Sequence, residues 1–387
     1  RFGLSPRDAY GHFLWTDPGL VRARTPYGLV LFALFPLVLA GTAPVHAGSV
    51  RYGVRNGIRG VVQTGMVLVG LGVAGWLSLD TAVRTLLEMD RFARQGEWDQ
   101  VLAAAERMPP GRTSAGANRN ILLALYHTGR LGDAMFRYPQ VHGRGPFAAA
   151  KDDGDYGALF QLSRIYFDLG QVNYAEKYGY DALDVAGEVP AALEHLALLS
   201  VVQGRRGAAH ILLGALGKNP FFRGRASERI RQIESDPPLA ADPRIAAVRS
   251  MVPESDSFTR QIDVEEVLLA LLKKNPKNRM AFEFLMAHWL AHGQPEKVAE
   301  NLGRLKDLGY TRTPRHYQEA LLIARGPDAA GRRSAGYEIE PDVLRQFESF
   351  LAIVKREPDA KAAAREARAA GLGETYFFFL SFGVSGF

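Results

Sequence analysis

Two histidines spaced four residues apart form the sharpest chemical motif in the chain. His288 and His292 fall on one face of a helix, where two imidazoles supply half of a zinc site. A helical zinc-protease motif also needs a glutamate directly after the first histidine, and Trp289 occupies that position. Glu283 and Glu296 are the nearest acids in sequence, but no spacing brings their carboxylates to the two rings. We therefore predict no metal site.

The remaining catalytic and cofactor motifs are incomplete. Gly70, Gly72 and Gly75 spell a dinucleotide-binding fingerprint, but no second strand ending in an acid follows them. Residues 152–155 read Asp-Asp-Gly-Asp and lack the ligand spacing of a calcium loop. The chain has no cysteine, which excludes disulfides, thiolate nucleophiles and thiolate metal sites. The sequence thus predicts no catalytic residue and no cofactor, and it favours a binding protein over an enzyme.

A basic cluster follows Phe221 in the middle of the chain. Its four arginines are Arg223, Arg225, Arg229 and Arg231. Arginines interleaved with aromatic side chains can bind phosphate or a single nucleic-acid strand. Glu228 and Glu234 dilute the positive charge here. We therefore expect a solvated helix face and no nucleic-acid partner.

The composition is that of a folded protein with unevenly distributed charge. The chain has 387 residues, of which 47% are apolar and 23% charged, so it is not a disordered polymer. The net charge is +6, and residues 1–95 carry +5 of it, with ten arginines against five acids. This surplus lies beside two apolar runs, which favours anionic lipid headgroups over nucleic acid as its partner. Residue 1 is Arg, so we expect a chain that is processed, truncated or incomplete.

The two apolar runs predict transmembrane helices. Residues 27–43 and 61–79 carry no charge, and their 17 and 19 residues approach the length of a bilayer span. The alternative for each run is a buried helix of a globular core. The loop between them holds Arg51, Arg55 and Arg59, which the positive-inside rule would place in the cytoplasm. Arginines on the outer flanks oppose this orientation, so counting charges leaves it open.

From residue 81 onward the sequence predicts helical hairpins. Apolar residues recur every three or four positions, which is the period of a helix face. The expected turns contain glycine, at Gly96, Gly129, Gly170, Gly204 and Gly293. The first two are 33 residues apart, and Gly170 and Gly204 are 34 apart, which is the period of a tetratricopeptide repeat. Stacked hairpins of this kind bury a continuous core and form a concave groove.

Residues around Gly170 carry the closest resemblance to that repeat. Leu162 and Tyr166 stand where the first helix packs, and Ala175 and Ala182 are the small residues that admit the second helix. The degenerate pattern covers roughly residues 81–325. The whole layout, which ends in a Thr-Tyr-aromatic terminus at 375–387, resembles an uncharacterised family of bacterial membrane proteins. That resemblance implies no specific activity, but it does imply an inner-membrane protein with a periplasmic repeat domain.

These patterns predict an all-α protein with N-terminal transmembrane helices followed by a tetratricopeptide-like α-solenoid. Its expected parts are a membrane-proximal segment (1–26), two transmembrane helices (27–80), repeats (81–235), a linker (236–260), and further helical repeats with an aromatic C-terminal cap (261–387). Residues 27–80 are expected to contact the lipid bilayer.

The expected function is that of a membrane-anchored scaffold in the bacterial envelope. A protein or peptide partner would lie in the solenoid groove, against side chains of each hairpin's first helix. The candidate contact residues are Asn118, Asn120, Gln161, Arg164, Glu194 and Glu283. One alternative is the C-terminal part of a polytopic glycan transferase or polymerase whose active site lies upstream. Another is a carrier of lipid or of a hydrophobic ligand.

Overall fold

The computed structural model describes residues 65, 81–109, 113–140, 156–252, 263–326 and 339–383. These residues form helices, turns and loops, with no strand among them, so the predicted all-helical class is confirmed there. The chain divides into two compact units, Arg1–Glu88 and Met89–Phe387. Within the first unit, the description covers Gly65 and the beginning of helix α5 (Thr81–Gln95).

The predicted transmembrane helices and the predicted inner-membrane location have to be corrected. No helix in the described ranges combines the length and the apolar character needed to cross a bilayer. The longest of them, α19 (Pro341–Arg356), has 16 residues and carries charges at both ends, whereas a span needs about 20 apolar residues. The apolar run 27–43 lies outside the described residues, and so does 61–79 except for Gly65.

The second unit is built from short helices in three groups. The first group comprises α6 (Trp98–Ala105), α7 (Ala115–His127), α8 (Leu131–Ala134) and the 3₁₀ turn η1 (Met135–Arg137). The second comprises α9 (Tyr156–Asp168), α10 (Val172–Ala186), α11 (Pro190–Val202), α12 (Arg206–Gly217), α13 (Arg223–Ser235) and α14 (Pro243–Met251). The third comprises α15 (Val264–Lys274), α16 (Arg279–Ala291), α17 (Pro295–Glu300), η2 (Leu302–Leu305), α18 (Arg315–Arg325), α19, α20 (Ala360–Ala369) and α21 (Tyr376–Phe382).

The hairpin turns form where the sequence predicts them. Gly170 ends α9 with φ of +82°, a left-handed conformation that a side chain would strain. The backbone N–H groups of Gly170 and Gln171 then bond back to Phe167 and Tyr166, which satisfies the last carbonyls of the helix. The other four predicted turn glycines also have positive φ: Gly96, Gly129, Gly204 and Gly293.

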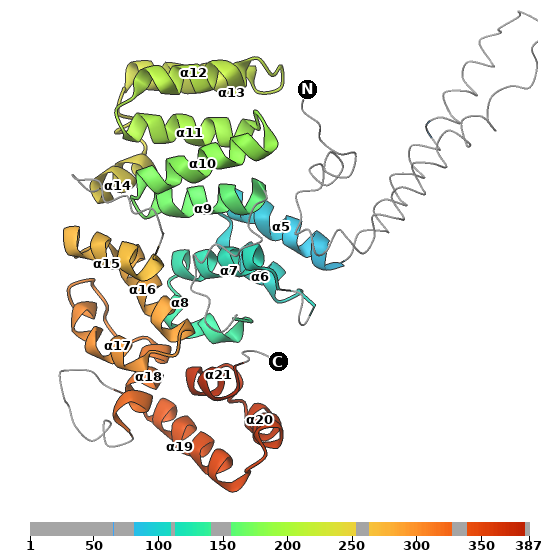
Figure 1. The fold of residues 1–387 in the computed structure, drawn as a ribbon, viewed down its shortest axis with the longest axis vertical. Coiled ribbons are helices and arrows are strands. Elements are labelled where there is room, and N and C mark those ends of the chain that lie inside the picture. The colour runs from blue at the N-terminus through green and yellow to red at the C-terminus, as the bar shows by residue number, and fades with distance from the viewer. Residues whose placement is uncertain are drawn as a thin grey trace, which may run out of the picture. The chain divides into compact units, whose positions relative to one another are not determined.

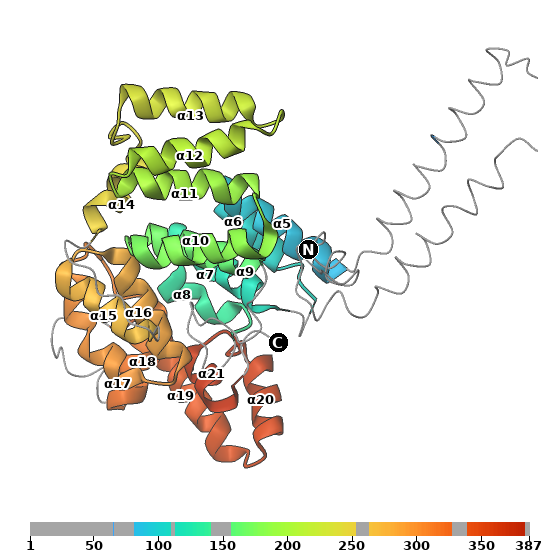
Figure 2. The same ribbon diagram turned by 45° about the horizontal axis from the view of Figure 1, so that its top comes forward.

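Helices α9 to α13 stack in successive layers (Figures 1 and 2). Small residues allow this close approach, since Ala175 and Ala182 on α10 are fully buried. Gly179 lies on the same helix, and a Cβ added to it would come within 2.7 Å of Leu196 on α11. Small residues spaced four and three positions apart on α10 therefore set how closely α9 and α11 pack against it.

The third group of helices does not simply continue the stack beyond α13. It packs on the first group instead: a Cβ on Gly132 of α8 would meet Pro314 at 2.6 Å. It also contacts the second group, where Asn278 just before α16 donates to the carbonyl of Leu169, directly after α9, at 3.2 Å. A tandem solenoid contacts only sequence neighbours, so these contacts are a departure from the simple repeat pattern. The stretch 236–260, which the sequence suggests as a linker, contains α14.

Four consecutive aromatic residues of α21, Tyr376 to Phe379, are buried. Phe377 and Phe378 of α21 pack in one apolar cluster with residues of α18, α19 and α20. On its other side, α21 meets η1, where the ring of Phe136 stacks on Tyr376 and Phe379 with centroids 5.3 Å and 4.7 Å away. This short helix therefore joins α18, α19 and α20 to η1 of the first group.

Candidate partner-binding surface

Of the six predicted contact residues, Asn118 and Asn120 lie on α7, and Gln161 lies on α9. Asn118 and Asn120 on α7 are buried, and Oδ1 of Asn118 and Nδ2 of Asn120 find no hydrogen-bond partner in the described part of the chain. Gln161 on α9 accepts a hydrogen bond from Nε of Arg119 at 3.2 Å. The structure thus places these three side chains inside or between helices.

The other three predicted residues are engaged in bonds of their own. Arg164 donates to the carbonyl of Ala93 at 3.0 Å, and Glu194 pairs with Arg225 at 2.9 Å. Buried Glu283 accepts from Nε of Arg279 at 2.7 Å and from the hydroxyl of Tyr310 at 2.5 Å.

The six residues occupy α7, α9, α11 and α16, and no described hydrogen bond or ion pair joins any two of them. Their role as partner contacts therefore stays a prediction.

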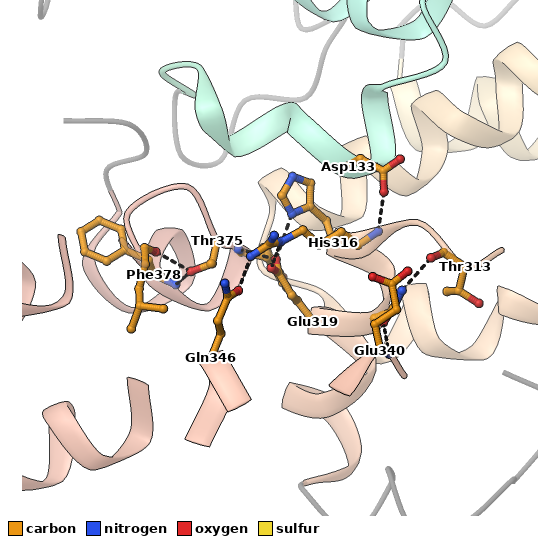
Figure 3. Close-up of polar contacts among 12 residues, drawn as sticks. Asp133, Thr313, His316, Glu319, Glu340, Gln346, Thr375 and Phe378 are labelled. Atoms are coloured by element: carbon orange, nitrogen blue, oxygen red, sulfur yellow. Dashed lines mark hydrogen bonds and ion pairs between the residues drawn. The ribbon is translucent and has the colours of Figure 1, made fainter. Parts of the chain in front are cut away.

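A buried polar network centres on Glu319 of α18 (Figure 3). Glu319 is 0% exposed, and its carboxylate accepts from Nε of Arg315 at 3.0 Å and from Nδ1 of His316 at 2.9 Å. The same carboxylate accepts the backbone N–H of Tyr376 at 2.8 Å, at the first residue of α21. One side chain thus joins two helices that are 57 residues apart in sequence.

Neighbouring polar groups extend this network to α8 and α19. Asp133 accepts from two guanidinium nitrogens of Arg312 at 3.0 Å and 2.7 Å, and from the backbone N–H of Arg315 at 2.7 Å. Gln318 accepts the backbone N–H of Glu340 at 2.8 Å, just before α19 begins. These hydrogen bonds therefore connect α8, α18 and the start of α19, although α8 is far from the other two in sequence.

The network is suited to holding helices together and not to chemistry on a ligand. An acid–histidine pair can relay protons, but Glu319 and His316 are both fully enclosed. Nε2 of His316 finds no partner among the described residues, so no hydroxyl nucleophile is hydrogen-bonded to it. We therefore assign this network a structural role.

The predicted histidine pair packs ring against ring. The rings of His288 and His292 stack with centroids 4.0 Å apart, and Nδ1 of His292 lies 2.8 Å from the carbonyl of His288. Glu265 accepts from Nε1 of Trp289 at 3.0 Å and from Nζ of Lys297 at 2.5 Å. In the part of the chain that the structure describes, no three His, Asp or Glu side chains are arranged to hold a metal.

Buried His195 is expected to make the stability of the fold depend on pH. Burial lowers the pKa of His195, whose Nε2 lies 3.1 Å from Oγ of Ser163, from 6.5 to about 3. The imidazole of His195 binds a proton more readily in the unfolded chain than in the folded one. The stability that neutral His195 contributes is therefore complete above pH 6.5 and falls as the pH is lowered toward 3.

When the pH is lowered from 7 to 5, we expect the free energy of unfolding of the wild type to fall by about 2 kcal/mol more than that of the His195→Gln variant. Glutamine does not titrate, so the variant lacks this loss. Urea unfolding at both pH values measures the difference. The same substitution at half-buried His210 on α12 is the control. Parallel losses in the wild type and in His195→Gln would show that His195 is not the source.

One surface hollow lies at the turn between α5 and α6 and the turn between α7 and α8. It measures about 500 Å³, and its lining includes Trp98, Asp99, His127 and Arg130. The rings of Trp98 and His127 stack on each other at 4.2 Å, and Arg130 pairs with Asp99 at 2.5 Å. These groups satisfy one another, so the hollow presents no vacant apolar anchor.

A second hollow lies at the turn between α12 and α13. It measures about 490 Å³ and is lined by Glu188, Pro190, Leu193, Ala215, Leu216, Lys218, Asn219, Pro220 and Phe221. Phe221 is 93% exposed and Ile211 on α12 is 75% exposed, the two highest values for large apolar side chains in the described residues. We call Gly207, Ile211, Gly214, Lys218 and Phe221 the α12 surface.

The basic cluster beside this surface is largely neutralised. Arg225 pairs with Glu194 and Arg231 pairs with Glu228. Arg229 donates to Gln232 at 2.9 Å. This arrangement is that of a solvated helix face whose arginines pair with carboxylates on α11 and on α13 itself.

Comparison with known proteins places the chain in a family without assigning it an activity. A family of unknown function (DUF6057) matches residues 10–383. The chain belongs to this family. No curated protein matches it, and no solved structure does.

Sequence reasoning did not single out the α12 surface. Its signal is the spacing of Gly207, Ile211 and Gly214, which puts all three on one side of a helix. The pattern of apolar residues alone does not reveal that this side faces outward, because Leu212, Leu213 and Leu216 of the same helix are buried.

Proposed function

We propose that the chain is a helical-repeat scaffold that binds a segment of another protein, and that the α12 surface is the contact. The observation that carries this proposal is the exposure of Phe221 and Ile211 next to a hollow lined by Leu193 and Leu216. Covering a large apolar side chain contributes about 1.5–3 kcal/mol, and aromatic anchors often dominate binding.

The repeat-like build of the unit supports the same function. Hairpins that turn at glycines 33 and 34 residues apart resemble tetratricopeptide repeats, which stack into surfaces for extended or helical protein segments. Helices α9 to α13 form such a stack, and α12 lies near its end (Figure 1).

Photo-crosslinking in the cells that make the protein tests the proposal. A photoreactive phenylalanine analogue in place of Phe221 is expected to give one discrete adduct with another protein. The Ile211→Asp substitution in the same chain should abolish that adduct, because it places a charge on the apolar contact. The analogue at exposed Glu234 of α13 is the control and should give none. Equal adducts from both positions, or an adduct that survives Ile211→Asp, would refute the proposed contact.

A further inference from the structure

We infer that the segment bound at the α12 surface is an acidic amphipathic helix that packs along α12. This inference rests on the proposed function and adds the chemistry of the partner. The partner's backbone would pass close to Gly207 and Gly214, an apolar side chain would meet Ile211, and carboxylates would face the cations beside them.

Three exposed residues of α12, together with Lys218 directly after it, form one narrow stripe. Gly207, Ile211, Gly214 and Lys218 are all exposed, and they are spaced by four, three and four positions. Successive residues of an α-helix are rotated by about 100°, so this spacing keeps all four within one side of the helix. The stripe leads directly to Phe221 and the hollow beside it.

The two glycines of this stripe are not required by the fold. A Cβ at Gly132 or Gly179 would collide with a packed neighbour, which explains glycine at those positions. A Cβ at Gly207 or Gly214 meets nothing within 4 Å. Glycine inside a helix costs stability relative to alanine, and neither residue has a compensating contact with the residues that the structure describes. A second helix that approaches closely across small residues supplies such a contact.

Charge indicates the sign of the partner. Arg206 and Lys218 are exposed and have no carboxylate partner in the described part of the chain. Arg223 makes only a 3.5 Å contact with the carbonyl of Gly217. Glu188 is the one acid that lines the hollow. A partner helix with carboxylates along its edges would complement these cations and gain electrostatic steering.

Two other occupants fit less well. A second copy of this chain, packed α12 against α12, would bring the same cations together without acids to match them. A nucleic-acid strand would need free guanidinium groups, but Arg225 and Arg231 are already paired with carboxylates.

Peptide binding measured by fluorescence anisotropy tests the inference on the full chain. The probe is a labelled helical peptide of about 20 residues, with an Ala-Leu-Ala stripe and glutamates at the flanking positions. Its matched control carries lysines in place of the glutamates. We expect the glutamate peptide to bind, the lysine peptide not to bind, and affinity to fall as salt is raised.

Two variants locate the site. Gly214→Leu should abolish binding by blocking the close approach, and Lys218→Glu should weaken it by about tenfold. Arg231→Glu, on the ion-paired face of α13, should leave binding unchanged. The melting temperature of Gly214→Leu should equal or exceed that of wild type, since leucine favours helix at an open position.

Several results would overturn the inference. These are equal binding of both peptides, unchanged binding by both site variants, or binding of a single-stranded oligonucleotide at the same surface. A Phe221 adduct that joins two copies of this chain would also overturn it. A Phe221 adduct with another protein, together with no binding of the glutamate peptide, would overturn this inference and leave the proposed function standing.

Discussion

Replacing Glu319 with alanine is expected to destabilise the protein by about 3–5 kcal/mol. The change removes the carboxylate that receives Arg315, His316 and the backbone N–H of Tyr376. Two of these three donors are enclosed, so they cannot regain hydrogen bonds from water without opening the structure. Urea unfolding measures the loss, and amide hydrogen exchange should show that α21 is the first helix to open.

The control for this variant is Glu348→Ala on the exposed side of α19. It removes the same side chain from a solvated position, so we expect a change within about 0.5 kcal/mol. Equal effects of the two substitutions would contradict the structural role of the Glu319 network, as would unchanged exchange protection in α21.

Phe378→Ala is expected to cost about 3–5 kcal/mol, because it empties a ring-sized volume in a closed core. Phe378 is 0% exposed and packs with residues of α18 to α20. Arg368 lies over its ring at 5.2 Å, and Phe382 lies at 5.0 Å. The loss should therefore spread to α19 and α20.

Phe221→Ala provides a matched comparison within the same chain. It makes the identical chemical change at a ring that is 93% exposed, so the free energy of unfolding should change by less than about 0.5 kcal/mol. Urea unfolding of both variants compares the two rings directly. A large loss for Phe221→Ala would mean that this ring serves the fold, and would remove the main support for the α12 surface.

Local patterns allowed much of the fold to be predicted from the sequence. The helical period, the turn glycines and the small residues Ala175 and Ala182 depend on near neighbours, and the structure has them as expected. The apolar runs before residue 80 predict transmembrane helices, whereas no helix in the described ranges is long and apolar enough to cross a bilayer. The contacts of α8 with α18 and with the turn before it join residues about 180 positions apart, and no repeat pattern encodes them.

The site was harder to predict than the fold. A polar residue on a first helix, such as Glu283 or Arg164, fits a groove in sequence, but the structure gives it a partner inside the array. Conversely, Ile211 looks like a core residue in sequence and faces outward. The exposure of a side chain on α12 depends on which helices pack against it. The spacing of residues within α12 does not reveal those tertiary contacts.

The Ile211→Asp variant tests most directly whether the α12 surface serves binding and not folding. Its free energy of unfolding should be measured on the purified variant, and its photo-crosslinking from position 221 in the cells that make it. We predict stability within about 0.5 kcal/mol of wild type, since the side chain is exposed, together with loss of the adduct. An adduct of undiminished yield from this stable variant would contradict the proposal.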